Sequence, residues 1–248
     1  MTAPLSWDYT HHASSYDARA DYCADLLDQV LQGLHLPPKA WALEVGAGTG
    51  KLSGHLLRHC QQLAALEPNA AMRALAVAKP ELSRIAWIAA LGEQLPLRQS
   101  SVDLIAYGSS FNVLPPQAAL SEAGRVLKSG GHWLALWNHR DLADPLQQRV
   151  EAVIRHHLPH FDSGTRRTSP AGLVQAHGGF TDLRAHEQGF SVTMPSSEWL
   201  RAWRAHATLQ RQAGDRLSAI IQDIGRLLAG RDTLQLPYVT RVWTARNT

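Results

Sequence analysis

Short apolar runs alternate with amphipathic, helix-like stretches along the first half of the chain. The apolar runs have the length of buried strands, and the stretches between them carry apolar residues at the spacing of one helix face. This alternation predicts an α/β fold in which helices cover a parallel sheet. We expect strands at 41–45, 63–66, 85–89, 102–107 and 133–137. Helices are expected at 16–35, at about 51–60, and at 117–127, where Ser129-Gly130-Gly131 ends the last of them. A further helix should begin after the cap residue Asn69, with Met72, Leu75 and Ala76 on its inner face.

The alternation becomes less regular after the fifth expected strand. Helical spacing predicts helices at 145–158, 170–177, about 196–209 and 213–229, and strands near 182–194 and 234–245. We expect a single domain of residues 1–248, with an N-terminal lid helix within 1–36 and a cofactor-binding core at 37–144. The late helices, within 145–180 and 195–230, would form a cap over the carboxyl edge of the sheet.

Composition restricts the class of protein more than it identifies a function. The chain has 248 residues, of which 45% are hydrophobic and 18% charged, so it can bury a large core and does not resemble a disordered chain. It contains no apolar run near the ~20 residues of a membrane span, and its N-terminus does not resemble a signal peptide. We therefore expect a cytoplasmic protein without a membrane partner, either a monomer or a homodimer. Cys23 and Cys60 cannot form a disulfide framework and suggest no metal site.

The net charge of +3 is small and unevenly distributed. Residues 1–130 carry 10 Lys and Arg against 11 Asp and Glu, whereas residues 131–248 carry 14 against 10. This distribution lacks the dense basic stripe of a nucleic-acid-binding protein, so no nucleic-acid partner is expected. The basic second half is compatible with an anionic small molecule or with solvated surface arginines.

Candidate chemistry gathers where the expected strands end. Ligands of open α/β sheets bind beyond the carboxyl ends of the strands. After the first strand, 44–50 reads Glu-x-Gly-x-Gly-x-Gly, which permits a sharp turn and close approach to a ligand but lacks the register of a nicotinamide dinucleotide fingerprint. Glu67 ends the second strand, where a carboxylate can accept both ribose hydroxyls of a nucleoside. It could also be a surface residue before a turn.

These residues occur in an order that resembles the class I S-adenosylmethionine-dependent methyltransferases, and in particular their type 11 small-molecule branch. The resemblance covers about 100 residues, Leu43 to Arg140, and the end of the chain, 236–243, is similar to the last, antiparallel strand of that family. The family fold is a Rossmann-like, seven-stranded, mostly parallel sheet with helices on both faces. The matching segments are 44–50, 66–72, 92–96, 101–105 and 122–131.

The resemblance implies S-adenosyl-L-methionine as cofactor and a role for each matching residue. The glycine turn would line the methionine and ribose portions, Glu44 would hold this turn and reach the amino group, and Glu67 would bind the ribose hydroxyls. Two departures are Leu91, where many relatives have an acidic residue for the adenine amino group, and Asn112-Val113, where a His-Trp pair is common. The N-terminal residues Tyr9, Tyr16 and Arg19 resemble, less closely, a family segment that folds over the methionine part. The other implied cofactor residues are Glu44, Gly46, Ala47, Gly48, Gly50, Glu67, Pro68, Met72 beside adenine, Gly92, Glu93, Tyr107, Gly108 and Ser109.

Candidate catalytic residues follow from the chemistry of methyl transfer, which needs alignment in a dry cavity and a general base only for a protonated acceptor. His139 follows the fifth strand, next to Asn138 and Asp141, and could be such a base oriented by a carboxylate, or it could be an exposed loop residue. His11, with His12, is a second candidate or part of a flexible tail. Asn112 could bind an acceptor or cap a turn.

Two further clusters have alternative interpretations. Trp199, Trp203 and His206 share one face of an expected helix, where they could stack on a planar acceptor or pack in a core. His156, His157 and His160 lack a carboxylate or cysteine that would complete a metal site, so surface histidines are the better interpretation.

The expected function is therefore methyl transfer to an O, N or C atom of a small, planar or apolar molecule, in a biosynthetic reaction. Two alternatives retain the fold. In one, S-adenosylmethionine assists a cyclisation or rearrangement without losing its methyl group; in the other, the protein binds without catalysis. A dehydrogenase is disfavoured by the glycine register.

Overall fold

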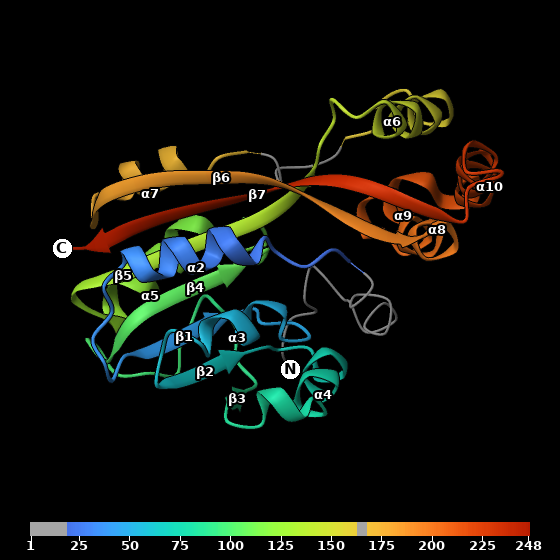
Figure 1. The fold of residues 1–248 in the computed structure, drawn as a ribbon. Coiled ribbons are helices and arrows are strands. Elements are labelled where there is room, and N and C mark those ends of the chain that lie inside the picture. The colour runs from blue at the N-terminus through green and yellow to red at the C-terminus, as the bar shows by residue number, and fades with distance from the viewer. Residues whose placement is uncertain (1–18, 163–167) are drawn as a thin grey trace.

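The computed structural model describes residues 19–162 and 168–248, whose backbone forms one mixed sheet with helices on both faces (Figure 1). In this part of the chain seven strands follow the order β3-β2-β1-β4-β5-β7-β6. The neighbours from β3 to β5 pair in parallel, and β7 runs antiparallel to β5 and β6. The expected Rossmann-like architecture is confirmed. The strands are β1 (Trp41–Val45), β2 (Gln62–Leu66), β3 (Ala86–Ile88), β4 (Val102–Gly108), β5 (Leu127–Arg140), β6 (Phe180–Pro195) and β7 (Thr233–Asn247).

Separate hydrophobic cores lie on the two faces of the sheet. Because successive side chains of a strand point to opposite faces, Leu104 and Ile105 of β4 enter different cores. The first core includes α5 and α7, and the second includes α2 and α3. The helices are α2 (Ala24–Gly33), α3 (Lys51–Leu56), α4 (Ala70–Val77), α5 (Pro116–Val126), α6 (Pro145–His157), α7 (Ala171–His177), α8 (Ser196–Arg204), α9 (Ala207–Ala213) and α10 (Leu217–Leu227).

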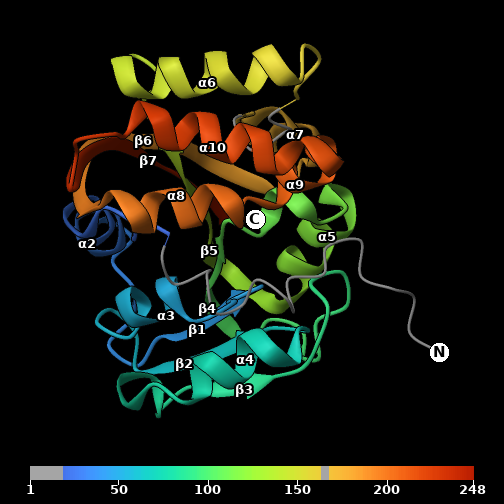
Figure 2. The same ribbon diagram turned by 90° about the vertical axis from the view of Figure 1, so that its right-hand side faces the viewer.

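A third core lies beyond the carboxyl edge of the sheet and is formed by α6, α8, α9 and α10, which we call the cap. The long strands β6 and β7 extend from the sheet to these helices, and Figure 2 shows α6, α10 and α8 stacked across this end of the molecule. Trp199 and Ile220 lie in the cap core, at 1% and 0% exposure. The long antiparallel strands β6 and β7, with α8, α9 and α10 between them in the chain, therefore connect the sheet to the cap.

The N-terminal helix is shorter than its amphipathic pattern predicts. The expected helix at 16–35 begins at Ala24, since residues 19–23 are not helical, and α2 packs on the sheet through residues such as Leu27. In α4, the Asn69 side chain accepts hydrogen bonds from the backbone of Ala71 and Met72, so the expected cap is confirmed. Leu75 is 36% exposed and does not share the buried face of Met72 and Ala76.

Elements of the second half differ more from expectation. Strand β5 is much longer than 133–137, because its first residue pairs with β4 and its last nine pair with β7. The helix expected at 196–209 is two helices, because the His206 ring accepts a hydrogen bond from the Leu209 backbone and starts α9 anew. Helix α7, which we expected in the cap, packs with α5 on the sheet through Val174.

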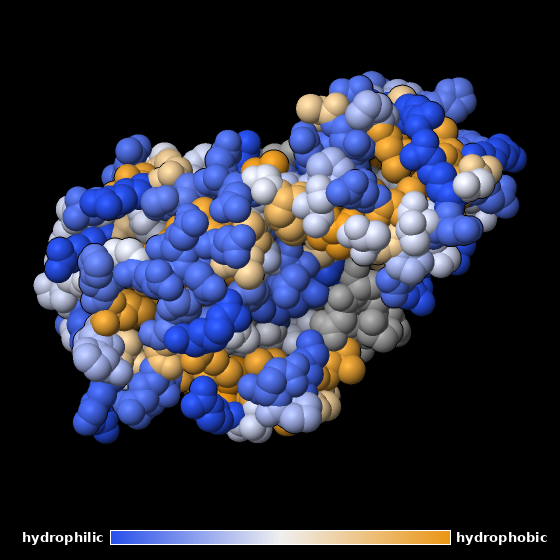
Figure 3. Space-filling view, in the orientation of Figure 1, coloured by the Kyte–Doolittle hydropathy of each residue, from blue (hydrophilic) through white to orange (hydrophobic). Residues whose placement is uncertain are grey.

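The surface in the orientation of Figure 1 is mostly hydrophilic over both the sheet and the cap, with small scattered hydrophobic areas (Figure 3). Among the described residues, no helix has the length and apolar character that crossing a membrane requires.

Candidate functional site

The glycine turn between β1 and α3 has a backbone that few other residues could adopt. Gly46 and Gly50 have φ angles of +68° and +83°, in the left-handed region. A Cβ atom on Gly46 would lie 2.6 Å from Ser110 Cβ, and one on Gly50 would lie 2.3 Å from Leu82 Cδ1. The turn therefore combines an unusual conformation with close packing, and leads directly into the N-terminus of α3.

Glu44 lies beneath this turn, with 1% of its surface exposed. Its carboxyl group accepts a hydrogen bond from the Ser53 hydroxyl in α3 and so connects β1 to that helix. Burial raises the pKa of Glu44 to about 8; the Ser53 hydrogen bond opposes this shift and the charge of Glu67 adds to it. Glu44 is therefore a carboxyl group that can hold its proton near neutral pH.

Glu67 lies at the end of β2 and faces the glycine turn. Its two carboxylate oxygens accept hydrogen bonds of 2.8 Å from the backbone N–H groups of Gly48 and Asn69. Burial raises its pKa, while these two hydrogen bonds act in the opposite direction. The carboxylate is thus fixed between the glycine turn and the beginning of α4.

Further hydrogen bonds hold the glycine turn and the start of α4 against the end of β2. The N–H group of Ala47 bonds to the Leu66 carbonyl at 2.9 Å, which joins the turn to β2. Arg73 donates to the carbonyls of Glu67 and Pro68. Met72 is 3% exposed and lies in the first turn of α4.

The segment after β3 brings a second acidic side chain to this edge. A Cβ atom on Gly92 would lie 2.7 Å from Leu114 and 2.8 Å from Val45, so the backbone is closely packed here. Within the described part of the chain, the Oε2 atom of Glu93 is buried and has no hydrogen-bond partner. A buried acceptor without a donor is costly, which marks Glu93 as a candidate ligand contact.

The end of β4 approaches the same edge through its backbone. Ser109 has a φ of +59° and its hydroxyl lies 3.1 Å from the Tyr22 hydroxyl, while the Gly108 position lies close to that same tyrosine oxygen. The ring of Tyr107 is fully buried and packs edge-on against Phe111. Tyr107 can therefore contribute only its backbone to a ligand site.

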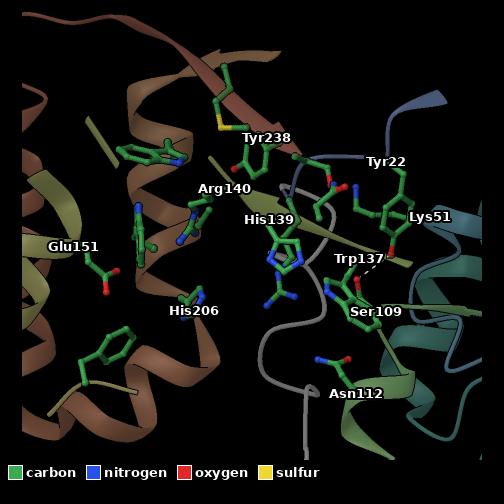
Figure 4. Close-up of a pocket in the computed structure, with 18 residues that line it drawn as sticks. Tyr22, Lys51, Ser109, Asn112, Trp137, His139, Arg140, Glu151, His206 and Tyr238 are labelled. Atoms are coloured by element: carbon green, nitrogen blue, oxygen red, sulfur yellow. Dashed lines mark hydrogen bonds between the residues drawn. The ribbon is translucent and has the colours of Figure 1, made fainter. Parts of the chain in front are cut away.

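A cavity of about 190 Å³ lies between this edge and the cap. Figure 4 shows Tyr22, Lys51 and Ser109 on one side of it and Glu151 and His206 on the other, with His139 between them. The wall combines aromatic and polar groups from both parts of the molecule. The described lining residues are Arg19, Ala20, Tyr22, Lys51, Ser109, Asn112, Trp137, Asn138, His139, Arg140, Glu151, Phe161, Met194, Trp199, Ala202, Trp203, His206 and Tyr238.

His139 and Asn112, both expected near the chemistry, line this cavity together with Ser109. The neighbours of His139 in the chain make other hydrogen bonds: the Asp141 carboxylate accepts one from the Ala143 backbone, and Asn138 donates to the Ala20 and Asp21 carbonyls. Neither interaction directs the imidazole.

Other expected residues have different surroundings. His11, His12, Tyr9 and Tyr16 lie outside the described residues. His157 pairs with Asp223 at 2.8 Å and connects α6 to α10. No group of three or more potential metal-binding side chains occurs among the residues described.

Several lining residues were not expected from the sequence. Lys51 follows the glycine turn, and Arg140 follows His139 at the end of β5, so their positions at strand ends were the available signal. Trp137 carried the same signal, since it ends the strand expected at 133–137, whereas Tyr22, just before α2, had none. Trp199 and Trp203 pack in the cap core, which was one of the two interpretations, and they also line the cavity; stacking on a planar acceptor stays a prediction.

Comparison with known proteins places this arrangement in a family. Residues 43–135 match the family model described as a methyltransferase domain. An uncharacterized methyltransferase of Mycobacterium tuberculosis is 33% identical over 219 residues, which is 80% of this chain and 79% of that protein.

Solved structures share the fold. A protein of Anaeromyxobacter dehalogenans described as a type II methyltransferase is 21% identical with a TM-score of 0.65, covering 92% of this chain and 97% of that one. A 4+2 cyclase, SpnF, is also 21% identical with a TM-score of 0.56, covering 93% and 84%. The sequence relative, the matched domain and the glycine and acidic residues at the sheet edge together show that the chain belongs to the class I S-adenosylmethionine-dependent methyltransferase family.

Proposed function

We propose that the protein binds S-adenosyl-L-methionine along the carboxyl edge of β1, β2 and β4 and transfers its methyl group to a small molecule in the adjoining cavity. The observation that carries this proposal is the Glu67 carboxylate, which is fixed 2.8 Å from the backbone nitrogen of Gly48 in the glycine turn. Two ribose hydroxyls are matched donors for a carboxylate at this place.

The shape of the edge fits the proposed cofactor. The bare backbone at Gly46 and Gly50 leaves no room for side chains and allows a ligand to approach closely. The buried Glu93 oxygen is an acceptor suited to the adenine amino group, a contact that Leu91 cannot make. Ser109 and its backbone would face the methionine portion.

When bound, S-adenosylmethionine would supply an electrophilic methyl group on its sulfonium and would be released as the neutral thioether S-adenosylhomocysteine. The task of this chain is to align the acceptor and exclude water. Trp137 and Tyr238 supply apolar walls for this purpose. Where the acceptor bears a proton, His139 is the candidate to receive it, and Asn112 can orient the acceptor by hydrogen bonding.

Binding of S-adenosylhomocysteine to purified protein, measured by isothermal titration calorimetry, tests the proposed site. We expect Glu67→Ala to weaken this binding at least about tenfold, since the variant loses the charged acceptor of the ribose hydroxyls. Glu81→Ala removes the same charge from an exposed turn and should bind as the native protein does. Equal affinity of the two variants would refute the assignment of Glu67.

The likeness to a cyclase concerns the fold alone. Mass spectrometry of the cofactor after turnover separates the two chemistries, since methyl transfer converts S-adenosylmethionine to S-adenosylhomocysteine and an assisted cyclisation does not. We expect conversion of one cofactor molecule for each product molecule.

A further inference from the structure

We propose that the methyl acceptor is held through a planar group in which a carbonyl oxygen lies next to an N–H or O–H group, as in a cyclic amide. The Trp137 indole donates to the oxygen, and the Asn112 side-chain oxygen accepts from the N–H or O–H group. This inference rests on the proposed function and specifies the class of substrate for that site. It depends on two buried polar atoms of the cavity wall that have no partner among the described residues.

Trp137 presents an N–H group that the folded chain leaves without an acceptor. The residue lies in β5, is 3% exposed, and packs against the Trp243 ring with 4.5 Å between the ring centres. This packing restricts the orientation of the indole. Its Nε1 atom is buried and has no hydrogen-bond partner within 19–162 and 168–248. Because a buried donor without a partner is costly, an oxygen atom of a ligand is favoured here.

Asn112 presents the complementary atom from a well-supported turn. It lies in a short 3₁₀ helix, Phe111–Val113, that follows β4. Phe111 is 2% exposed and the Ser110 hydroxyl donates to the Val45 carbonyl, so the two preceding residues anchor this turn to the sheet. The Oδ1 atom of Asn112 is buried and, in the described part of the chain, has no donor. An amide oxygen can accept from an N–H or O–H group.

The two side chains belong to one wall of the cavity. The Ser109 N–H group bonds to the Leu136 carbonyl at 2.8 Å, and Trp137 and Asn112 follow this contact by one and three residues along their segments. Figure 4 shows both side chains on the same side of the cavity as Ser109. The Ser109 hydroxyl is itself engaged with the Tyr22 hydroxyl at 3.1 Å. A ligand at this wall therefore meets an unpartnered donor from Trp137 and an unpartnered acceptor from Asn112.

A cyclic amide or a comparable hydroxy-carbonyl group satisfies both atoms at once, because it carries an acceptor and a donor side by side. The remainder of the molecule faces apolar side chains such as Met194 and Tyr238, which are 8% and 9% exposed. The cavity volume of about 190 Å³ suits a body of one or two rings, since sites for drug-sized ligands have ~300–1,000 Å³. The bound group lies beside Ser109, which would face the methionine portion of the cofactor.

Isoindolin-1-one and phthalide test this proposal, because the lactone differs from the lactam only by an oxygen atom in place of the N–H group. Each is titrated calorimetrically into protein saturated with S-adenosylhomocysteine. We expect the lactam to bind at least about tenfold more tightly, since a site built to bind an N–H group rejects an analogue that lacks it. Asn112→Ala should bring this ratio close to one, whereas Asn112→Asp, which keeps an oxygen acceptor, should retain it.

Trp137→Phe examines the second contact. It removes the donor to the carbonyl oxygen that both probes share, so both affinities should fall about five- to tenfold while their ratio is retained. Trp41→Phe is the matched control, because Trp41 begins β1 at the end of that strand away from the glycine turn and is not among the described residues that line the cavity. It should change neither affinity.

The proposal is wrong if S-adenosylhomocysteine binds but lactam and lactone bind equally, or neither binds at millimolar concentration. It is also wrong if the preference for the lactam survives Asn112→Ala. Unchanged affinities in Trp137→Phe would overturn the role of the indole. If S-adenosylhomocysteine itself does not bind, the proposed function fails, and this inference fails with it.

Discussion

Glu44 is the residue whose environment differs most from that of an ordinary glutamate. It is buried beneath the glycine turn, and burial raises its pKa to about 8. The folded protein therefore holds this proton between the ordinary value of 4.5 and about 8, whereas the unfolded chain loses it. Because the folded state binds more protons in this window, its stability is full below the lower value and falls as the pH rises.

Glu44→Gln should remove this dependence. We expect the free energy of unfolding of the native protein to decrease, relative to that of the variant, by up to about 1.4 kcal/mol per pH unit between pH 5 and 8. Urea unfolding at several pH values measures it. Glu198→Gln, in an exposed ion pair, serves as the control. Parallel pH profiles for native protein and Glu44→Gln would contradict the prediction.

Glu93 permits a second test with single substitutions. If its buried oxygen accepts a hydrogen bond from the adenine amino group, the native protein should prefer S-adenosylhomocysteine over S-inosylhomocysteine, which lacks that group. Glu93→Ala should reduce the ratio of the two affinities about tenfold. Competition titration of the two nucleosides gives the ratio, and Glu81→Ala should retain it. An unchanged preference in Glu93→Ala would assign the adenine contact elsewhere.

At the level of elements, helix α4 depends on a single capping side chain. The Asn69 oxygen accepts hydrogen bonds from the backbone of the second and third residues of the helix, Ala71 and Met72, both at 3.0 Å. Asn69→Ala should destabilise the protein by about 1 kcal/mol. Asn69→Asp, which keeps the cap, should cost less. Thermal unfolding measures both, and equal losses in the two variants would show that the cap contributes little.

The sequence predicted the elements that carry local signals. Periodic apolar residues located β1 and β4, and Asn69 marked the start of α4. The turns and acidic residues at strand ends likewise indicated the cofactor edge. These features depend on neighbours in the chain, so a sequence pattern can reveal them.

Features that depend on tertiary contacts could not be predicted in this way. The pairing of β5 with β7 extends β5 far beyond its apolar centre. The His206 cap divides one periodic stretch into two helices. The position of Arg140 over Trp203 requires the cap to fold back on the sheet. No local spacing encodes these contacts.

At the level of the whole molecule, the cap has a core of its own and is connected to the sheet by β6 and β7. Ile220 is fully buried in that core, and Ile220→Ala should cost about 2–5 kcal/mol locally. We expect faster amide exchange in α8 and α10 and loss of acceptor binding, with β1 still protected and S-adenosylhomocysteine still bound.

Ile105→Ala provides the comparison, because Ile105 is equally buried but lies in the sheet core. This variant should weaken nucleoside binding and increase exchange in β1 and β4. Hydrogen exchange followed by mass spectrometry distinguishes the two patterns. Simultaneous loss of protection in both parts of Ile220→Ala would show that the cap and the sheet unfold as one unit.

The last residue and the cavity lie at opposite ends of the sheet, which has a practical consequence. Arg19 and Ala20 line the cavity, and Asn138 and Thr240 tie the backbone just after them to the sheet. Thr248 instead bonds to Gly179, at the opposite end of the sheet from the cap (Figure 1). A linker or surface attachment joined at Thr248 would therefore start at the end of the sheet away from the cavity and would keep the space between the sheet and the cap clear.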